Sequence, residues 1–249
     1  MNKPTSQVTE NAGFAPRCLS LDLEVGKTDS RIHQFAGVRG DTQEAFVYSK
    51  GPLGKALGQL DAFASGVAFL LGHNLIAFDT PHLEAAKPDL RLLKLPRVDT
   101  LRLNPLAFPR NPYHHLVKHY QDGQLKRGRV NDPELDARLT LEVFRDQHRE
   151  LSALTDTAPD LLLAWHWLTT IEEASSGLNS FFLTLRRKAR PSEQEALAAI
   201  RRCMSGQVCV TATERILADV ATQGWPLAYA LAWLTVAGGN SVMPPWVRH

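Results

Sequence analysis

The stretch over residues 19–24, with the sequence LSLDLE, constrains the fold more than any other part of the chain. Apolar residues alternate there with small or acidic ones, which predicts a buried strand. Side chains two residues apart in a strand point to the same face, so Asp22 and Glu24 lie side by side at its end. Two carboxylates this close repel each other, and a divalent cation makes such a pair favourable. An exposed acidic strand end is the alternative reading of the pair.

Strands and helices alternate along the first part of the chain. Apolar patterns predict five strands, over residues 17–25, 31–38, 44–49, 67–71 and 97–100. The pair Gly40-Asp41 is a hairpin turn signal between the second and the third. Helices are expected from Pro52, around Phe78 and Asp79, and over residues 114–120 and 132–151. This order predicts an α/β fold with a mixed sheet flanked by helices, ending near residue 154.

The helix that begins at Asp132-Pro133-Glu134 has the clearest start signal in the sequence. An acceptor stands at the N-cap, proline at the first helical position, and an acid near the positive end of the helix dipole. The expected buried stripe consists of Leu135, Leu139, Val143 and Phe144. Asp136 would lie at the edge of this stripe and face the sheet.

From residue 155 to residue 249 the pattern predicts an all-helical region. Ser192 with Glu195, and Thr211 with Glu214, each match a capping box, and a last apolar helix is expected over residues 225–236. We expect four tryptophans to be core residues and not base-stacking platforms: Trp165, Trp167, Trp225 and Trp233. A run of basic residues is expected to form a solvated helix face: Arg186, Arg187, Lys188 and Arg190.

Composition and length favour a globular cytoplasmic protein. The chain has 249 residues, 44% of them hydrophobic, and a net charge of only +2, so any nucleic-acid binding must come from local patches. Cys18, Cys203 and Cys209 lack C-x-x-C spacing, which argues against a zinc site. No signal peptide and no membrane-spanning run is visible. Residues 1–16 are expected to be a disordered tail, 17–154 the α/β domain, and 155–249 a helical region truncated from a longer protein.

Four carboxylates fall where the predicted elements could bring them together. Asp22 and Glu24 end a strand, Asp79 begins a helix after a central strand, and Asp136 lies on a late helix. If they converge at one edge of the sheet, they would bind two Mg²⁺ or Mn²⁺ ions, which prefer oxygen ligands. Such a pair of ions is suited to hydrolysis of a phosphodiester by in-line displacement.

Three motifs carry a resemblance to a known family. Residues 21–24 (LDLE), 72–79 (GHNLIAFD) and 131–138 (NDPELDAR) resemble, in this order, the motifs of the DEDD exonucleases, the DnaQ-like branch of the ribonuclease H-like fold. Asp99-Thr100 also falls where that family ends a strand in Asp-Thr. The similarity covers roughly residues 17–152. It implies a ribonuclease H-like domain with two-metal 3′–5′ exonuclease activity on the 3′ ends of single-stranded DNA.

This sequence departs from the family at two places. Asn131 stands where the histidine branch of the family has its general base, and Val25 follows Glu24 where a threonine is frequent. Histidine accepts a proton near neutral pH, whereas a neutral amide only orients a water. Three readings stay open: weakened hydrolysis, replacement of the base by His114, His115 or His119, and a binding module that no longer cuts.

The resemblance also suggests where nucleic acid would bind. It places Val25 and Gly26 against the terminal nucleotide, with His73, Asn74 and Phe78 shaping the same pocket, although Phe78 could be a core residue. A basic loop could contact phosphates, or simply be solvated: Lys118, Lys126, Arg127 and Arg129. The tail over residues 238–249 is similar to a segment of RecQ-type helicases with an N-terminal exonuclease domain, which implies a helicase motor as partner in DNA repair or defence. RNA remains an alternative substrate.

Overall fold

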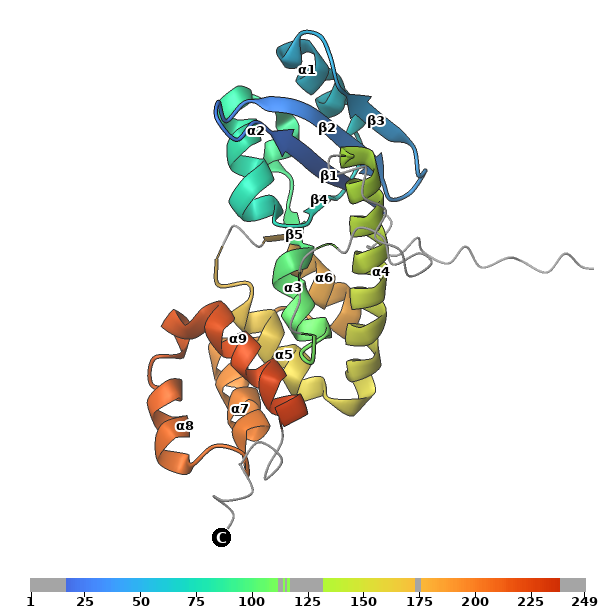
Figure 1. Cartoon of the computed structure of the whole chain (residues 1–249). Helices are drawn as coiled ribbons and strands as arrows, with labels where there is room; N and C mark the ends of the chain where they lie inside the picture. Colours follow the sequence, from blue (N-terminus) through green and yellow to red (C-terminus); the bar gives the residue numbers. More distant parts are fainter. Residues whose placement is uncertain (1–16, 112–113, 115, 117–131, 173–175, 238–249) are drawn as a thin grey trace, which may run out of the picture.

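The computed structural model describes residues 17–111, 114, 116, 132–172 and 176–237 of the chain. Within these residues the strands are β1 (Cys18–Val25), β2 (Ile32–Arg39), β3 (Ala45–Tyr48), β4 (Phe69–Gly72) and β5 (Arg97–Asp99). They form one mixed sheet in the order β3-β2-β1-β4-β5 (Figure 1). Strands β1, β2 and β3 pair antiparallel, and β1, β4 and β5 pair parallel. The α/β fold with a mixed sheet is therefore confirmed.

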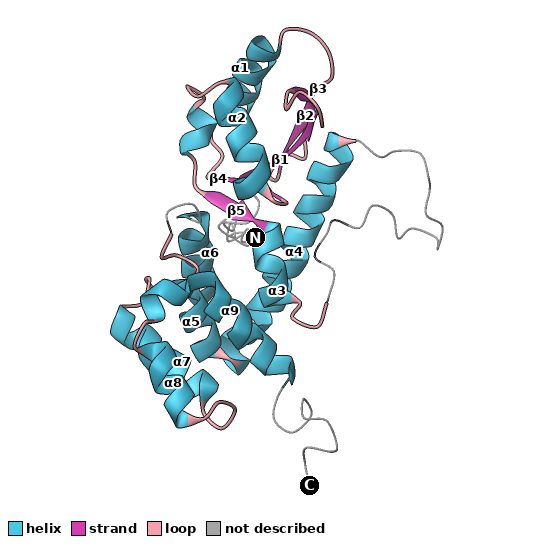
Figure 2. Ribbon diagram, turned by 60° about the vertical axis from the view of Figure 1, so that its left-hand side comes forward, coloured by secondary structure: helices cyan, strands magenta, loops and turns pink. Residues whose placement is uncertain are grey.

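Helices flank this sheet and build the remainder of the described chain (Figure 2). The first group consists of α1 (Leu53–Phe63), the π-helix η1 (Leu75–Asp79), α2 (Thr80–Ala86), the 3₁₀-helix η2 (Arg91–Lys94), α3 (Thr100–Ala107) and α4 (Pro133–Thr157). The second group consists of α5 (Pro159–Leu168), α6 (Ser176–Arg186), α7 (Glu193–Met204), α8 (Val210–Leu217) and α9 (Val220–Ala237). None of the helices in the described ranges combines the length and the hydropathy of a membrane-spanning segment.

The alternation in β1 divides its side chains between two cores. Leu19, Leu21 and Leu23 are buried against the face that α1 covers, in one apolar cluster with Leu57 and Leu60. The residues between them point to the opposite face, which α4 covers. The polar side of β1 is therefore turned toward α4, which places Asp22 and Glu24 beside that helix.

The helical region shares a core with the α4 side of the sheet. The Phe144 ring of α4 contacts Phe69 of β4 at a centroid distance of 5.8 Å and Phe181 of α6 at 5.7 Å. At Gly177, the start of α6 approaches β5 so closely that a Cβ atom would lie 2.5 Å from the carbonyl oxygen of Arg97. The boundary predicted near residue 154 falls inside α4, which continues to Thr157.

The buried face of α4 differs from the predicted stripe. Phe144 is buried as expected, but Leu135, Leu139 and Val143 are only half-buried. The buried positions of the helix are Pro133, Asp136, Ala137, Thr140, Leu141, Phe144, Gln147 and Leu151. The hydrophobic pattern predicted the wrong face because α4 also turns polar side chains inward. The amide of Gln147, for example, donates hydrogen bonds to the carbonyl oxygen of Thr100 and to Asn104 on α3. Asp136 consequently lies within the buried face and not at its edge.

Two further expectations about the helical region were wrong. Helix α7 has the capping box of Ser192 and Glu195, but α8 begins at Val210, so Thr211 lies inside that helix. Trp165, Trp167 and Trp225 are buried, whereas Trp233 is 55% exposed.

The basic run after α6 is not merely a solvated helix face. Arg186 donates a hydrogen bond of 2.7 Å to Nδ1 of the buried His166, and Arg190 donates one of 2.8 Å to Oγ1 of Thr170. The expected tails over residues 1–16 and 238–249 lie outside the described residues. So does most of the helix expected over residues 114–120, where His114 and Leu116 belong to no regular element.

Candidate metal centre

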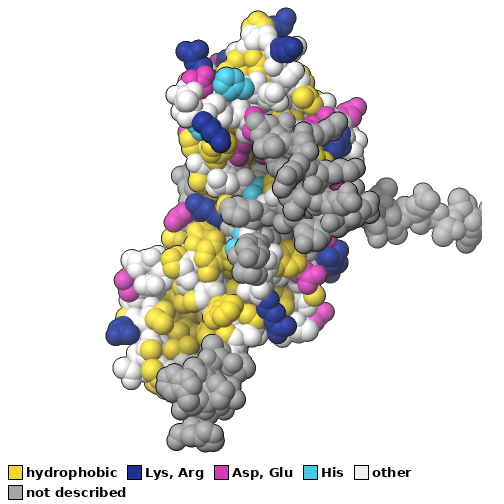
Figure 3. Space-filling view, in the orientation of Figure 1, with side chains coloured by type: hydrophobic (Ala, Val, Ile, Leu, Met, Phe, Trp, Pro, Cys, Tyr) yellow, Lys and Arg dark blue, Asp and Glu magenta, His cyan; other side chains and the backbone are white. Residues whose placement is uncertain are grey.

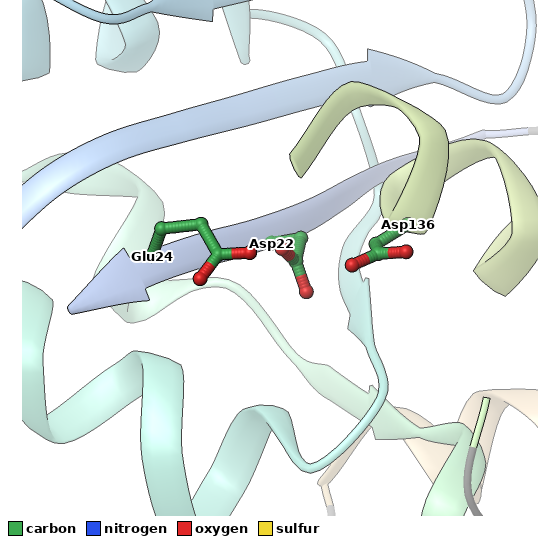
Figure 4. A group of neighbouring side chains, drawn as sticks. All are labelled: Asp22, Glu24 and Asp136. Atoms are coloured by element: carbon green, nitrogen blue, oxygen red, sulfur yellow. The ribbon is translucent and has the colours of Figure 1, made fainter. Parts of the chain in front are cut away.

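Three acidic side chains meet where the end of β1 faces the start of α4 (Figure 4). One ligand oxygen from each of Asp22, Glu24 and Asp136 lies within 4.8 Å of those of the other two. Asp22 and Glu24 are half-buried, and Asp136 is only 4% exposed. Figure 4 shows the Asp22 side chain between the other two, on the strand that also carries Glu24. The fold thus brings Glu24 and Asp136, which are 112 positions apart in the chain, into one group.

The position of Asp136 is fixed by contacts on either side of it. The hydroxyl of Ser20 on β1 donates a hydrogen bond of 2.8 Å to the carbonyl oxygen of Ala137, which holds the first turns of α4 against the strand. The side chain of Asp132 accepts a hydrogen bond of 3.1 Å from the backbone N–H of Leu135, as predicted for the N-cap. These contacts fix both the first turn of α4 and the position of the helix along β1, so the side chain of Asp136 is directed at Asp22.

Asp79 lies close to this group but is not one of its three members. Strand β4 pairs with β1 only as far as Ser20, so the strand edge beyond that point lacks a strand partner on the β4 side. Asp79 accepts a hydrogen bond of 3.1 Å from the backbone N–H of Leu23 at this edge. Burial is the largest cause of a raised pKa of about 8 for Asp79; the hydrogen bond from the Leu23 N–H acts against it, and the negative charges of Asp99 and Glu24 act with it.

The turn that presents Asp79 is built by hydrogen bonds to the end of β5. The carboxylate of Asp99 accepts bonds from the backbone N–H groups of Asn74 (2.9 Å), Ile76 (3.1 Å) and Leu101 (3.0 Å). Asn74 has a positive φ of 74°, and the chain continues directly into the π-helix Leu75–Asp79. π-helical turns are rare in proteins, and those that occur often lie at functional sites. The Asp-Thr end of β5 is therefore a positioning element for the second motif.

His73 is held by the residue that follows Asp99. Its Nδ1 lies 2.9 Å from the hydroxyl of Thr100, and that hydroxyl donates a hydrogen bond of 3.1 Å to the carbonyl oxygen of Gly72. If Thr100 donates to Gly72, then Nδ1 of His73 is the donor to Thr100, which fixes the tautomer of the ring. His73 and Asn74 therefore lie in the turn that presents Asp79.

The remaining residues expected to contact nucleic acid are only partly described. Phe78 is 38% exposed, which excludes the alternative that it is a core residue, and its ring meets His82 edge-on at 4.9 Å. Val25 and Gly26 are half-buried at the end of β1, and a side chain at position 26 would collide with Asp29 and His33. The residues predicted from the basic loop and the third motif lie outside the described residues: Lys118, Lys126, Arg127, Arg129 and Asn131.

Of the three histidines considered as substitutes for the general base, only His114 lies among the described residues. The Nδ1 of His114 lies 3.2 Å from Nδ2 of Asn104, and the side chain of Gln147 donates a hydrogen bond of 3.0 Å to Oδ1 of Asn104. Gln147 follows Asp136 by eleven residues on α4, which is about 16 Å along the helix axis. His114 therefore contacts the α3 side chain that also binds Gln147, and not the turn of α4 that carries Asp136. His115 and His119 lie outside the described residues.

The group of three carboxylates has the chemistry of a site for a hard divalent cation. Carboxylate oxygens are the preferred ligands of Mg²⁺ and Mn²⁺, and three negative charges at this spacing are mutually repulsive without a cation. The donor set contains neither thiolate nor imidazole, which softer metals favour. Asp22, Glu24 and Asp136 fit such an ion.

Sequence reasoning missed two residues that hold this site together. Ser20 precedes Asp22 by two residues and therefore shares its face of β1, which was the available signal. Asp99 was noted only as part of a family pattern, although an acid directly before a helix start also predicts an N-cap.

No protein-family model, no curated protein and no solved structure matches this chain significantly.

Proposed function

We propose that this chain is a metal-dependent 3′–5′ exonuclease that acts on the 3′ ends of single-stranded DNA. The observation that carries the proposal is that ligand oxygens of Asp22, Glu24 and Asp136, from two motifs far apart in the chain, lie within 4.8 Å of one another. The three carboxylates lie on a face shared by the end of strand β1 and the start of helix α4.

The fold and the second motif add support. The strand order is β3-β2-β1-β4-β5, with β1 in the centre and β2 antiparallel to both of its neighbours. This arrangement agrees with the ribonuclease H-like fold that the motifs imply. In open α/β sheets, sites gather at the carboxyl ends of the parallel strands. β1, β4 and β5 end at this edge, where Asp22, Glu24 and the turn of residues 73–79 lie.

Asp22, Glu24 and Asp136 would hold the divalent cations, with Asp79 at the periphery of the site. When bound, two Mg²⁺ or Mn²⁺ ions supply positive charge for the attacking water and for the departing 3′ oxygen. In the reaction, the water oxygen bonds to the phosphorus, the bond from phosphorus to the 3′ oxygen of the preceding nucleotide breaks, and a 5′-mononucleotide is released. The exposed ring of Phe78 offers a surface for the terminal base.

The proton from the attacking water has no histidine acceptor at position 131. Asn131 would orient the water without accepting its proton, so we expect weaker hydrolysis than a histidine would give, by a factor that general-base catalysis typically sets at about 10²–10⁴. The second candidate is a module that binds a strand end without cutting it, alone or linked to a helicase motor. The two candidates differ in one property: only the exonuclease would shorten the strand that it binds.

The test is a strand-shortening assay on a 5′-labelled single-stranded oligonucleotide with Mn²⁺ or Mg²⁺. The wild-type chain is compared with Asp22→Asn, Glu24→Gln and Asp136→Asn, and with Asp89→Asn as a matched acidic control on the surface. We expect a ladder of products shortened from the 3′ end for the wild type and the control, and none for the three site variants. Equal shortening by all variants, or none by any of them while the strand is bound, would overturn the exonuclease proposal.

A further inference from the structure

A pocket of about 500 Å³ lies between the end of α3 and the helix α9, away from the carboxylates. Figures 1 and 2 both show α3 and α9 side by side, and Figure 3 shows hydrophobic side chains gathered over this helical half of the molecule. The residues that line the pocket are Pro105, Pro109, Arg110, Asn111, His114, Tyr229 and Trp233. None of the functions assigned above uses them.

Two aromatic rings of α9 form one wall of this pocket. Trp233 follows Tyr229 by four residues, so both side chains lie on the same side of the helix. Tyr229 is held in place, because its hydroxyl donates a hydrogen bond of 3.2 Å to the carbonyl oxygen of Arg102 and its ring meets Trp225 at 5.4 Å. Trp233, at 55% exposed, is the outermost aromatic side chain of the wall. The pocket therefore presents flat aromatic surface to solvent.

The charge of the lining selects among ligands. Arg110 is exposed at the rim, and none of the described residues that line the pocket is acidic. Flat aromatic faces beside a cation are the combination with which proteins bind single-stranded nucleic acid, where the bases stack and the phosphates meet positive charge. An apolar peptide would not use the arginine, and a free phosphate would not use the rings.

The position of the pocket suits a strand that also reaches the carboxylates. His114 in its lining is joined through Asn104 to Gln147 of α4, which lies about 16 Å along that helix from Asp136. An extended strand of a few nucleotides spans such a distance.

We infer that the Trp233 pocket binds bases of single-stranded nucleic acid, several nucleotides upstream of the 3′ end that the carboxylates would process. The assignment of the strand to the substrate rests on the proposed function, whereas the binding of nucleic acid by the pocket does not.

The test measures binding and hydrolysis separately. Fluorescence anisotropy with a labelled oligothymidylate of about 15 nucleotides, in EDTA, reports strand affinity without metal chemistry. Hydrolysis of thymidine 5′-monophosphate p-nitrophenyl ester in Mn²⁺ reports the carboxylate site without a strand. The variants are Trp233→Ala, Trp233→Phe and, as a matched control, Leu183→Ala, which removes another exposed apolar side chain from α6.

We expect Trp233→Ala to weaken strand binding about fivefold to hundredfold, the loss typical of one base–aromatic stack. Trp233→Phe should lose less, Leu183→Ala should bind as the wild type does, and the ester should be hydrolysed equally by all four proteins. Unchanged strand affinity in Trp233→Ala overturns the inference. If that variant has unchanged strand affinity but an altered oligomeric state, the inference is also overturned, and the pocket is an interface between copies of the chain. Failure of the wild type to hydrolyse the ester, with strand affinity still dependent on Trp233, would count against the proposed function alone.

Discussion

Neutralising Asp22 should stabilise the metal-free protein and, at the same time, remove its response to divalent cations. Asp22 lies between Glu24 and Asp136, with ligand oxygens of all three within 4.8 Å (Figure 4). Two unit charges 4.8 Å apart repel by about 3 kcal/mol at an effective dielectric constant of about 20. Water screens Asp22 and Glu24, which are half-buried, so we expect Asp22→Asn to gain about 1–3 kcal/mol in free energy of unfolding.

The assay is thermal or urea unfolding at neutral pH, with EDTA or with Mn²⁺. A gain of 1–3 kcal/mol corresponds to a rise of roughly 3–10 °C in Tm for a chain of this size. Mn²⁺ should raise the Tm of the wild type, because an ion that binds only the folded state stabilises it, and should raise that of Asp22→Asn much less. The control Asp89→Asn, which loses an exposed ion pair with Lys87, should change stability by at most about 1 kcal/mol in either condition.

The reasoning would be refuted by an Asp22→Asn variant that is less stable than the wild type in EDTA and whose Tm responds to Mn²⁺ as strongly as the wild type's does. Such a result would mean that the three carboxylates do not repel one another in the folded state. They would then be a structural cluster without need of a cation.

Three other predictions concern single positions. Asn131→His should raise the rate of strand shortening at neutral pH by about 10² or more, measured under single-turnover conditions; an unchanged rate would mean that proton transfer is not limiting. Asp79 has a pKa of about 8 in the folded, metal-free protein and an ordinary value of 3.8 in the unfolded chain. Between these two values the folded state keeps a proton that the unfolded state has released, so the free energy of unfolding should fall as pH rises from about 4 to about 8. Asp79→Asn should flatten that slope in urea unfolding, and an identical slope would contradict the assignment. Gly177→Ala should destabilise the chain by about 1–3 kcal/mol, because the new Cβ meets the backbone of Arg97; a neutral effect would show that α6 can move away from β5.

Local patterns in the sequence predicted the elements that carry the site. The alternation in residues 19–24 gave strand β1 and the shared face of Asp22 and Glu24, because a strand has a fixed period of two. The signal at Asp132 and Pro133 gave the start of α4, because an N-cap acceptor and a first-turn proline act within a few residues. Both signals are independent of the surrounding fold.

The sequence did not predict which face of α4 is buried. Leu135 and Leu139 are more apolar than Thr140 and Gln147, yet the latter two are buried. Gln147 is buried because its amide donates hydrogen bonds to the carbonyl oxygen of Thr100 and to Asn104, partners that only the tertiary structure supplies. A polar residue with such partners is indistinguishable, in the sequence, from one that faces water.

The same limit applies to Asp79 and Trp233. The motif places Asp79 near the site, but only the structure shows that its carboxylate accepts the N–H of Leu23 at the strand edge that β4 leaves open. Helical spacing among aliphatic residues suggested that Trp233 is a core residue. Its neighbour Tyr229 is half-buried, while Trp233 lies one turn further along and outside the core.

The most direct test of the central claim is an anomalous-scattering measurement on crystals of the chain soaked in Mn²⁺. We predict a peak of anomalous density within bonding distance of carboxylate oxygens from Asp22, Glu24 and Asp136, absent from crystals of Asp22→Asn. Density elsewhere on the molecule, with none between these three side chains at millimolar Mn²⁺, would contradict the claim that they form a metal centre.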